Sequence, residues 1–188
     1  MTTQISTHLN GVDLERLVAT VNAVKESPEL ARFTFRAHNE WTGGGSSRST
    51  IQGFYGAGQQ DSSRSRPFIL VGDEPPVLLG DNAGPNAVEA VLHALAACLA
   101  VGFAYNAAAQ GITVESLSFD LEGDLDLQGF LGLSEETRAG CDTIRLTYRV
   151  KSDAPRQRIL ELCEYVQKTS PLLDIIRNPV PVSIQIAD

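Results

Sequence analysis

Cysteine and positive charge are both scarce in this sequence, and each shortage argues against a class of protein. The 188 residues include only 3 Cys, with no C-x-x-C pair, so neither a disulfide scaffold nor a zinc site is indicated. The 15 Lys and Arg are outnumbered by 23 Asp and Glu, which gives a net charge of −8 and a pI of about 4.9. This balance argues against nucleic acid or an anionic membrane as a partner. Unpaired thiols fit a reducing, cytoplasmic location best.

Long apolar runs are scarce as well, because only one occurs, over residues 88–109. Glu89, His93 and Asn106 and the many alanines within it argue against a membrane span. Residues 1–4 lack the basic flank and apolar core of a secretory signal. With 43% apolar and 20% charged residues, the chain is expected to form one soluble globular domain with its own core.

The apolar run predicts one long helix that is buried on several sides. Pro85 suits a first helical turn, and Asn86 and Asp81 are candidate caps. Gly111 is expected to end the helix, since glycine readily adopts a left-handed conformation. Cys98 lies in the middle of this helix, and a single sulfur among apolar side chains requires an explanation.

Two interpretations of Cys98 remain open. A free cysteine commonly packs as a small hydrophobe and has no further role. A chemical role needs a lowered thiol pKa, and a position in the middle of a helix requires a cation from elsewhere in the chain. His93 shares a helix face with Glu89 but lies about 140° round from Cys98, so no Cys–His pair is predicted. Arg48, beside the glycine turn at 42–47, is either solvated or the missing cation.

The other periodic segments predict an α+β fold, because strands cluster in hairpin-like runs rather than alternating strictly with helices. A loop is expected over 56–66, and the alternation after the long helix is broken once, around Ser116. Helices are predicted over 12–24 and 155–169, and strands over 33–41, 49–55, 67–71, 112–126, 144–150 and 180–186.

Three segments together resemble the OsmC/Ohr family, the osmotically induced and organic-hydroperoxide-resistance proteins. Gly84-Pro85-Asn86, Glu89 and Ala96-Ala97-Cys98-Leu99 resemble the family's helix signature. His38-Asn39-Glu40-Trp41 with the glycine turn and Arg48, and the segment from Ser170-Pro171 to Val182, agree with it. The resemblance implies an OsmC-like fold, with curved antiparallel-rich sheets around a long central helix in an intertwined homodimer. Residues 1–30 are expected to form a helical extension and residues 31–188 the OsmC-like domain.

The resemblance also implies thiol peroxidase chemistry, in which Cys98 attacks a peroxide and Arg48 stabilises the thiolate. The acid that partners the arginine in one branch corresponds to Val88, so Glu89 is the candidate replacement. Ser170 stands where the family has its second, disulfide-forming cysteine, and a serine forms no disulfide. Cys163, two helical turns earlier, is either a substitute resolving thiol or a packed residue. Cys141 is expected to be a bystander in a loop.

Two functions therefore stay open at this point. The first is a peroxidase that reduces alkyl or lipid hydroperoxides and depends on a thiol reductant, with no metal or other cofactor. The alternative is a non-enzymatic binding or oxidant-sensing module with an apolar pocket at the dimer interface. The loss of the second cysteine and of the acid at Val88 favours this alternative. A different cysteine-based activity has no Cys–His–Asp spacing to support it.

Overall fold

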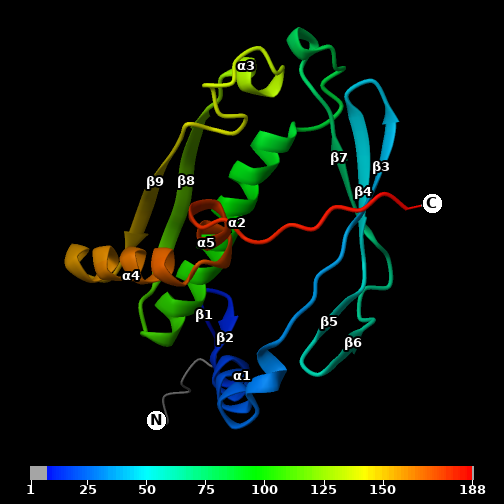
Figure 1. Ribbon diagram of the computed structural model, residues 1–188. Coiled ribbons are helices and arrows are strands. Elements are labelled where there is room, and N and C mark those ends of the chain that lie inside the picture. The colour runs from blue at the N-terminus through cyan, green and yellow to red at the C-terminus, as the bar shows by residue number, and fades with distance from the viewer. Residues whose placement is uncertain (1–7, 188) are drawn as a thin grey trace, which may run out of the picture. The chain divides into compact units, whose positions relative to one another are not determined.

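The computed structural model describes residues 8–187 of the chain (Figure 1). The chain divides into two compact units, one formed by residues 1–12 and 92–188 and the other by residues 13–91. We call these the C-terminal unit and the N-terminal unit. The division falls inside the long helix α2 (Ala87–Ala109). The expectations for residues 1–4, and for the first seven residues of the predicted extension, lie outside the described part of the chain.

The N-terminal unit contains short helices and small antiparallel sheets. Asp13 caps α1, as its sequence position predicts, by accepting a hydrogen bond of 3.0 Å from the backbone N–H of Arg16. The strands form a three-stranded sheet in the order β3-β4-β7 and a separate β5-β6 hairpin. The elements are α1 (Leu14–Glu26), η1 (Pro28–Ala31), β3 (His38–Gly43), β4 (Ser46–Ile51), β5 (Phe54–Gly56), β6 (Gln59–Asp61), β7 (Phe68–Gly72) and η2 (Pro76–Leu78).

Two expectations for this unit differ from the structure. The strand predicted over 33–41 begins only at His38, because the residues before it pair with another segment through one isolated bridge alone, between Thr34 and Tyr55. The segment 56–66, predicted as a loop, contains the turn of the β5-β6 hairpin. Ala57 and Gly58 form that turn with φ of 50° and 79°, the conformation that two-residue hairpin turns require.

The C-terminal unit packs two helices against a long antiparallel hairpin. Its core comprises Leu95, Leu99, Phe103, Ala107, Ile112, Leu162 and Val166. The inward side chains of β8 and β9 pack against this core. Among them are Phe119 and Tyr148, whose ring centroids are 4.9 Å apart. The elements are β1 (His8–Leu9), β8 (Val114–Asp124), α3 (Leu127–Phe130), β9 (Thr143–Ser152), α4 (Arg156–Thr169) and α5 (Pro171–Arg177), and the division between the units falls within β2 (Val12–Asp13) and within α2.

Helix α2 begins and ends where the sequence predicts. Asn86 and Glu89 form a reciprocal capping box, in which each backbone N–H donates to the other residue's side chain at 2.9 Å. Gly111 follows the last turn with φ of 70°. Within the described residues, α2 alone is long and apolar enough to cross a membrane, with a mean hydropathy of 1.9. This is weak evidence for a span, since the core helix of a soluble protein passes the same test.

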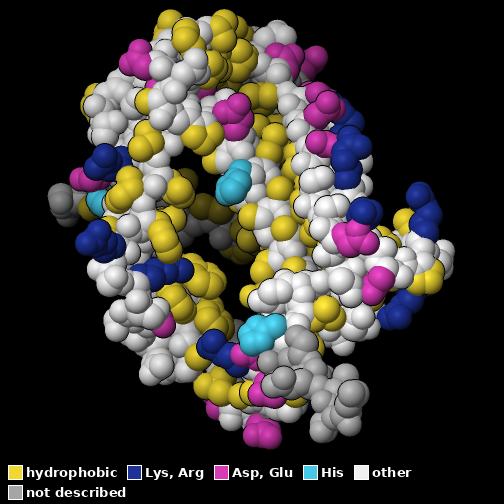
Figure 2. All heavy atoms as spheres, turned by 180° about the vertical axis from the view of Figure 1, so that it is seen from behind, with side chains coloured by type: hydrophobic (Ala, Val, Ile, Leu, Met, Phe, Trp, Pro, Cys, Tyr) yellow, Lys and Arg dark blue, Asp and Glu magenta, His cyan; other side chains and the backbone are white. Residues whose placement is uncertain are grey.

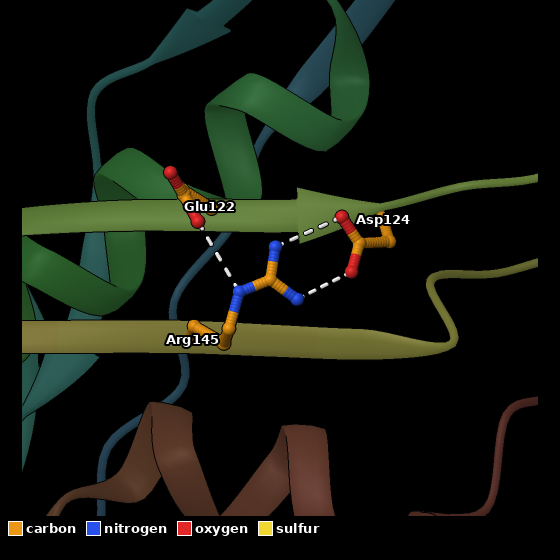
Figure 3. Close-up of polar contacts among 3 residues, drawn as sticks. All are labelled: Glu122, Asp124 and Arg145. Carbon is orange, nitrogen blue, oxygen red and sulfur yellow. Dashed lines mark hydrogen bonds and ion pairs between the residues drawn. The ribbon is translucent and has the colours of Figure 1, made fainter.

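The outer face of the β8-β9 hairpin carries cross-strand ion pairs (Figure 3). Arg145 donates from Nε to Glu122 at 3.2 Å, and its two terminal nitrogens donate to the Asp124 carboxylate. The bidentate bond to Asp124 raises the pKa of Arg145 and lowers that of Asp124. The expected break in the alternation around Ser116 is confirmed, because the strand register shifts between Val114 and Ser116.

The strand predicted over 180–186 is wrong for the described chain, in which this segment pairs with no other strand. Its alternating apolar residues are solvent-exposed instead, and Ile184 and Ile186 are 87% and 99% accessible. The period-two pattern shows what the segment can bury, whereas strand formation needs a partner edge that supplies hydrogen bonds.

Candidate functional site

Cys98 lies in the middle of α2, next to the buried stripe formed by Leu95, Leu99 and Phe103. Its side chain is half-buried, and its Sγ is 3.2 Å from the hydroxyl oxygen of Ser170. Both residues belong to the C-terminal unit. The contact joins positions 72 residues apart in the chain. The structure therefore brings the predicted reactive thiol together with the serine that stands at the family's second-cysteine position.

The sequence Ser170-Pro171 explains how the serine reaches the sulfur. Proline disfavours helical geometry for the residue before it, so α4 ends at Thr169 and Ser170 is extended, with φ of −77° and ψ of 113°. The Ser170 hydroxyl then caps α5 by accepting the Leu173 N–H at 3.2 Å. Its side chain is buried, with 5% of the residue exposed. The expected end of α4 is confirmed, whereas α5 was missed because its seven residues are too short for a clear pattern.

A close approach of α4 to α2 supports this contact. A Cβ at Gly102 would lie 3.2 Å from a methyl carbon of Val166, so glycine leaves room for α4 at this point. Gly102 is one turn after Cys98, and Val166 is one turn before Ser170. The pairing Gly102–Val166 therefore lies one turn away from the pairing Cys98–Ser170, in the order expected for two chain segments that run antiparallel. The packing of α4 on α2 thus sets the position of Ser170 relative to the sulfur.

Arg48 belongs to the N-terminal unit, where it lies on the central strand β4 of the three-stranded sheet. Its Cα faces Glu40 of β3 and Val71 of β7 in the strand register. The side chain is exposed, and it forms no ion pair with any residue of the described chain. The guanidinium is therefore available for a partner.

Glu89 has a structural task in addition to the one expected. One of its carboxylate oxygens, Oε2, accepts the Asn86 N–H in the capping box of α2. The residue is exposed and belongs to the N-terminal unit, and Val88 beside it is half-buried. The capping-box spacing, Asn at the cap and Glu three residues later, is a signal in the sequence that identifies this role.

Cys163 lies half-buried on α4 and packs against the core of the C-terminal unit. Burial, with a smaller contribution from Glu164, raises the pKa of its thiol above the ordinary value. The thiol lines a pocket of about 390 Å³ between β9 and α4, together with Tyr148 and Ile159. Burial also raises the pKa of Tyr148 to about 12, and its hydroxyl has no hydrogen-bond partner in the described chain. Sequence reasoning missed Tyr148, because alternation marks it only as inward-facing.

The third cysteine, Cys141, packs against Gly123 of β8, where a Cβ would lie 3.3 Å from its sulfur. All three cysteines are free thiols. No group of three or more His, Cys, Asp or Glu side chains that could hold a metal ion occurs in residues 8–187. At Cys98 the structure places a thiol next to a hydroxyl group.

The fold and the half-buried cysteine of its long helix place the chain among small α+β proteins built around a central cysteine-bearing helix. The family model described as OsmC-like protein matches residues 80–185, which include α2 and Ser170. The chain belongs to the OsmC/Ohr family, and the resemblance seen in its sequence is confirmed. No curated protein matches the sequence.

Solved structures share the fold at low sequence identity. An OsmC-like protein from Mycoplasma pneumoniae is 18% identical, with a TM-score of 0.58 over 78% of this chain and 89% of that one. A candidate osmotic stress induced and detoxification response protein from Psychrobacter arcticus 273-4 is 9% identical, with a TM-score of 0.56 over 75% and 87% of the two chains. These similarities establish the α+β fold with antiparallel sheets and a long helix.

Proposed function

We propose that this protein is a thiol-dependent peroxidase that reduces alkyl or lipid hydroperoxides through Cys98. The observation that carries the proposal is the placement of a half-buried thiol in the central helix, 3.2 Å from a buried hydroxyl group. Membership of the OsmC/Ohr family supports a redox role related to peroxides. Buried leucines beside Cys98 on α2 provide aliphatic surroundings, which suit an organic hydroperoxide better than hydrogen peroxide.

In this reaction the Cys98 thiolate attacks the terminal oxygen of the hydroperoxide ROOH. An S–O bond forms and the O–O bond breaks, so the sulfur loses two electrons and the departing alkoxide takes a proton to become ROH. Cys98 is left as a sulfenic acid. Ser170 cannot form a disulfide with it, so an external thiol attacks the sulfenic sulfur and releases water. A second thiol then displaces the mixed disulfide and regenerates Cys98.

The other predicted residues have supporting roles in the proposal. Arg48 supplies the cation that the mid-helix thiolate requires, and its lack of an ion pair within residues 8–187 leaves its charge available. Glu89 orients Arg48 with the carboxylate oxygen that the capping box does not use. Cys163 is the weaker candidate for a resolving thiol, because its raised pKa leaves less thiolate at neutral pH.

The partners in this proposal are a second copy of the chain, the hydroperoxide and the thiol reductant, and the location is the cytoplasm. Exposed apolar side chains support the homodimer, and Figure 2 shows apolar side chains spread over the face that it draws. The exposed apolar residues of the described chain include Val101 and Tyr105 of α2. Monomeric proteins rarely leave large contiguous apolar areas uncovered. The net charge of −8 supports the absence of a nucleic-acid partner.

The alternative is an oxidant-sensing or binding module that does not turn over, with an apolar ligand pocket at the dimer interface. The contact between Cys98 and Ser170 favours it, because a serine at this position prevents rapid intramolecular resolution. Oxidised Cys98 then persists, as a sensor requires.

Stopped-flow oxidation of the reduced protein by cumene hydroperoxide separates these functions, with mass spectrometry of each cysteine and with Cys98→Ser and Cys163→Ser as variants. The peroxidase proposal expects fast oxidation of Cys98, steady turnover once a thiol reductant is added, and complete loss of both in Cys98→Ser. Fast oxidation without turnover supports the sensing module. A Cys98 that oxidises no faster than free cysteine overturns both oxidant-based functions and leaves ligand binding.

A further inference from the structure

We infer that the Ser170 hydroxyl donates a hydrogen bond to the Cys98 thiolate and holds it in its ionised form, a positioning role that rests on the proposed function of Cys98. The contact of 3.2 Å between Sγ and Oγ is compatible with either atom as the donor when Cys98 is a neutral thiol. Once Cys98 is ionised, the sulfur has no proton to give, and only the hydroxyl group can donate.

The surroundings of Ser170 fix the direction of this hydrogen bond. A hydroxyl group carries one proton and two acceptor lone pairs. The Leu173 N–H donates to the Ser170 oxygen at 3.2 Å and so uses one lone pair, which leaves the proton free. In the described chain, the only other partner of this oxygen is the Cys98 sulfur. A buried polar group needs a partner, so the proton is directed at the sulfur.

The same contacts hold the hydroxyl in place. Pro171 keeps Ser170 extended, and the cap on α5 fixes the side chain to the first turn of that helix. A different χ1 rotamer of Ser170 would move the oxygen and break both hydrogen bonds, in a site that is only 5% exposed. The donor is therefore positioned before the thiol ionises, and little reorganisation is needed when the charge appears.

The titratable and charged groups on the elements that carry Cys98 and Ser170 form no hydrogen bond with the sulfur in the described residues. Asp174 of α5 accepts the side-chain N–H of Asn178 at 2.8 Å, and Lys168 at the end of α4 forms no ion pair within residues 8–187. His93 and Tyr105 of α2 form no hydrogen bond with the sulfur. Ser170 is the one hydrogen-bond partner of Cys98 in the described chain. It retains a donor where the family places a second thiol, and it is not consumed by oxidation.

The test measures ionisation of Cys98 without any peroxide. In a background of Cys141→Ser and Cys163→Ala, the rate of alkylation by iodoacetamide is followed against pH, which gives the pH at which half of Cys98 is ionised. A hydrogen bond to a charged group is worth enough to move this midpoint upward by roughly one pH unit when it is lost. We expect this shift in Ser170→Ala and Ser170→Gly, and a midpoint close to that of the parent in Ser170→Thr, which keeps the hydroxyl.

Two controls separate ionisation from folding. Glycine caps helices nearly as well as serine, so Ser170→Gly removes the donor with little loss of the α5 cap. Thr169→Val removes a neighbouring hydroxyl that donates to the Tyr165 carbonyl rather than to Cys98, and we expect it to leave the midpoint unchanged. An unchanged midpoint in Ser170→Gly, with the circular dichroism spectrum of the parent, overturns the proposal and leaves Ser170 as a cap alone. A shift in Ser170→Thr as large as in Ser170→Ala also overturns it.

A negative result for the role of Ser170 can be distinguished from a negative result for the proposed peroxidase function. A wild-type Cys98 that ionises at neutral pH, with a midpoint that depends on Ser170, supports the present inference even when cumene hydroperoxide does not oxidise it. Fast oxidation by cumene hydroperoxide in both the wild type and Ser170→Gly, with equal midpoints, supports the peroxidase and rejects the role of Ser170.

Discussion

The two units bury very different kinds of residue. Every buried hydrophobic side chain of the described chain belongs to the C-terminal unit, with Phe103 at its centre and fully inaccessible. In the N-terminal unit only Gly56 and Asp73 are buried within residues 13–91. The residues of strand β7, Phe68–Gly72, are mostly apolar on both faces, and Phe68, Ile69, Leu70 and Val71 are all substantially exposed.

This difference teaches that the two units are stabilised differently. A strand that is apolar on both faces is typical of a sheet covered on both sides, so β7 has the composition of a buried strand without the cover. The C-terminal unit has a core that accounts for its stability. The N-terminal unit relies on hydrogen bonds, on aromatic stacking and on any partner that covers its apolar strands. Arg48 belongs to this unit, whereas Cys98 belongs to the C-terminal unit.

The largest expected effect is on the core of the C-terminal unit. Phe103→Ala leaves a cavity at a fully buried site and should lower the free energy of unfolding by about 3–5 kcal/mol, whereas Phe35→Ala, at a ring 71% exposed, should cost much less. Urea unfolding followed by circular dichroism measures both variants. Equal losses would show that the rings of the N-terminal unit are buried in solution, and the contrast between the units would then be wrong.

The next effect tests whether the two units contribute to one reaction. Arg48→Ala should slow oxidation of Cys98 by cumene hydroperoxide by roughly thirtyfold, because loss of a cation raises the barrier for forming and aligning the thiolate. The matched control is Arg36→Ala, which removes an exposed arginine of the same unit that donates to Gln60 at 3.1 Å. If the two variants slow the reaction equally, the effect comes from overall charge, and Arg48 has no specific role.

A smaller effect is expected on association. If a second copy covers β7, Leu70→Lys places a charge in that interface and should raise the dimer dissociation constant by roughly tenfold or more. Val77→Lys changes an apolar residue outside β7, 85% exposed in η2, and should leave the constant near that of the wild type. Light scattering during size exclusion over a dilution series measures both. A wild type that is monomeric at every concentration contradicts the proposed homodimer.

How much could be predicted from the sequence depended on whether the information was local. The bounds of α2, the Asp13 cap and the bulge near Ser116 follow from residues within a few positions of each other, and all three are confirmed. The β5-β6 hairpin was missed because an Ala-Gly turn is a weak signal. The strand expected over 180–186 depends on a partner edge that the segment itself does not encode.

The candidate site shows the same difference between local features, which the sequence predicts, and long-range contacts, which it does not. Cys98 stood out because it is the one sulfur in an apolar helix, and Ser170 because it departs from the family's pattern. Their hydrogen bond joins residues far apart in the chain and depends on how closely α4 packs at Gly102, which no local pattern gives. The capping role of Glu89, in contrast, was present in the spacing of Asn86 and Glu89.

The smallest expected effect concerns Asp73, the buried carboxylate that organises the loop before α2. Its Oδ2 accepts the Ala83 and Asp81 N–H groups at 3.0 Å each, and these bonds, led by that from Ala83, lower the pKa of Asp73 from 3.8 to about 2.

Because the folded pKa is depressed, the carboxylate adds stability that is fully present above pH 3.8 and is lost as the pH falls toward about 2. The melting temperature of wild type should therefore exceed that of Asp73→Asn at neutral pH, and the difference should shrink as the pH falls through about 2. Differential scanning calorimetry at several pH values checks this, with Asp81→Asn, an exposed carboxylate of the same loop, as the control. A difference that does not change with pH would show that Asp73 stabilises the fold through packing and not through its charge. The N-terminal unit would then depend on packing, as the C-terminal unit does.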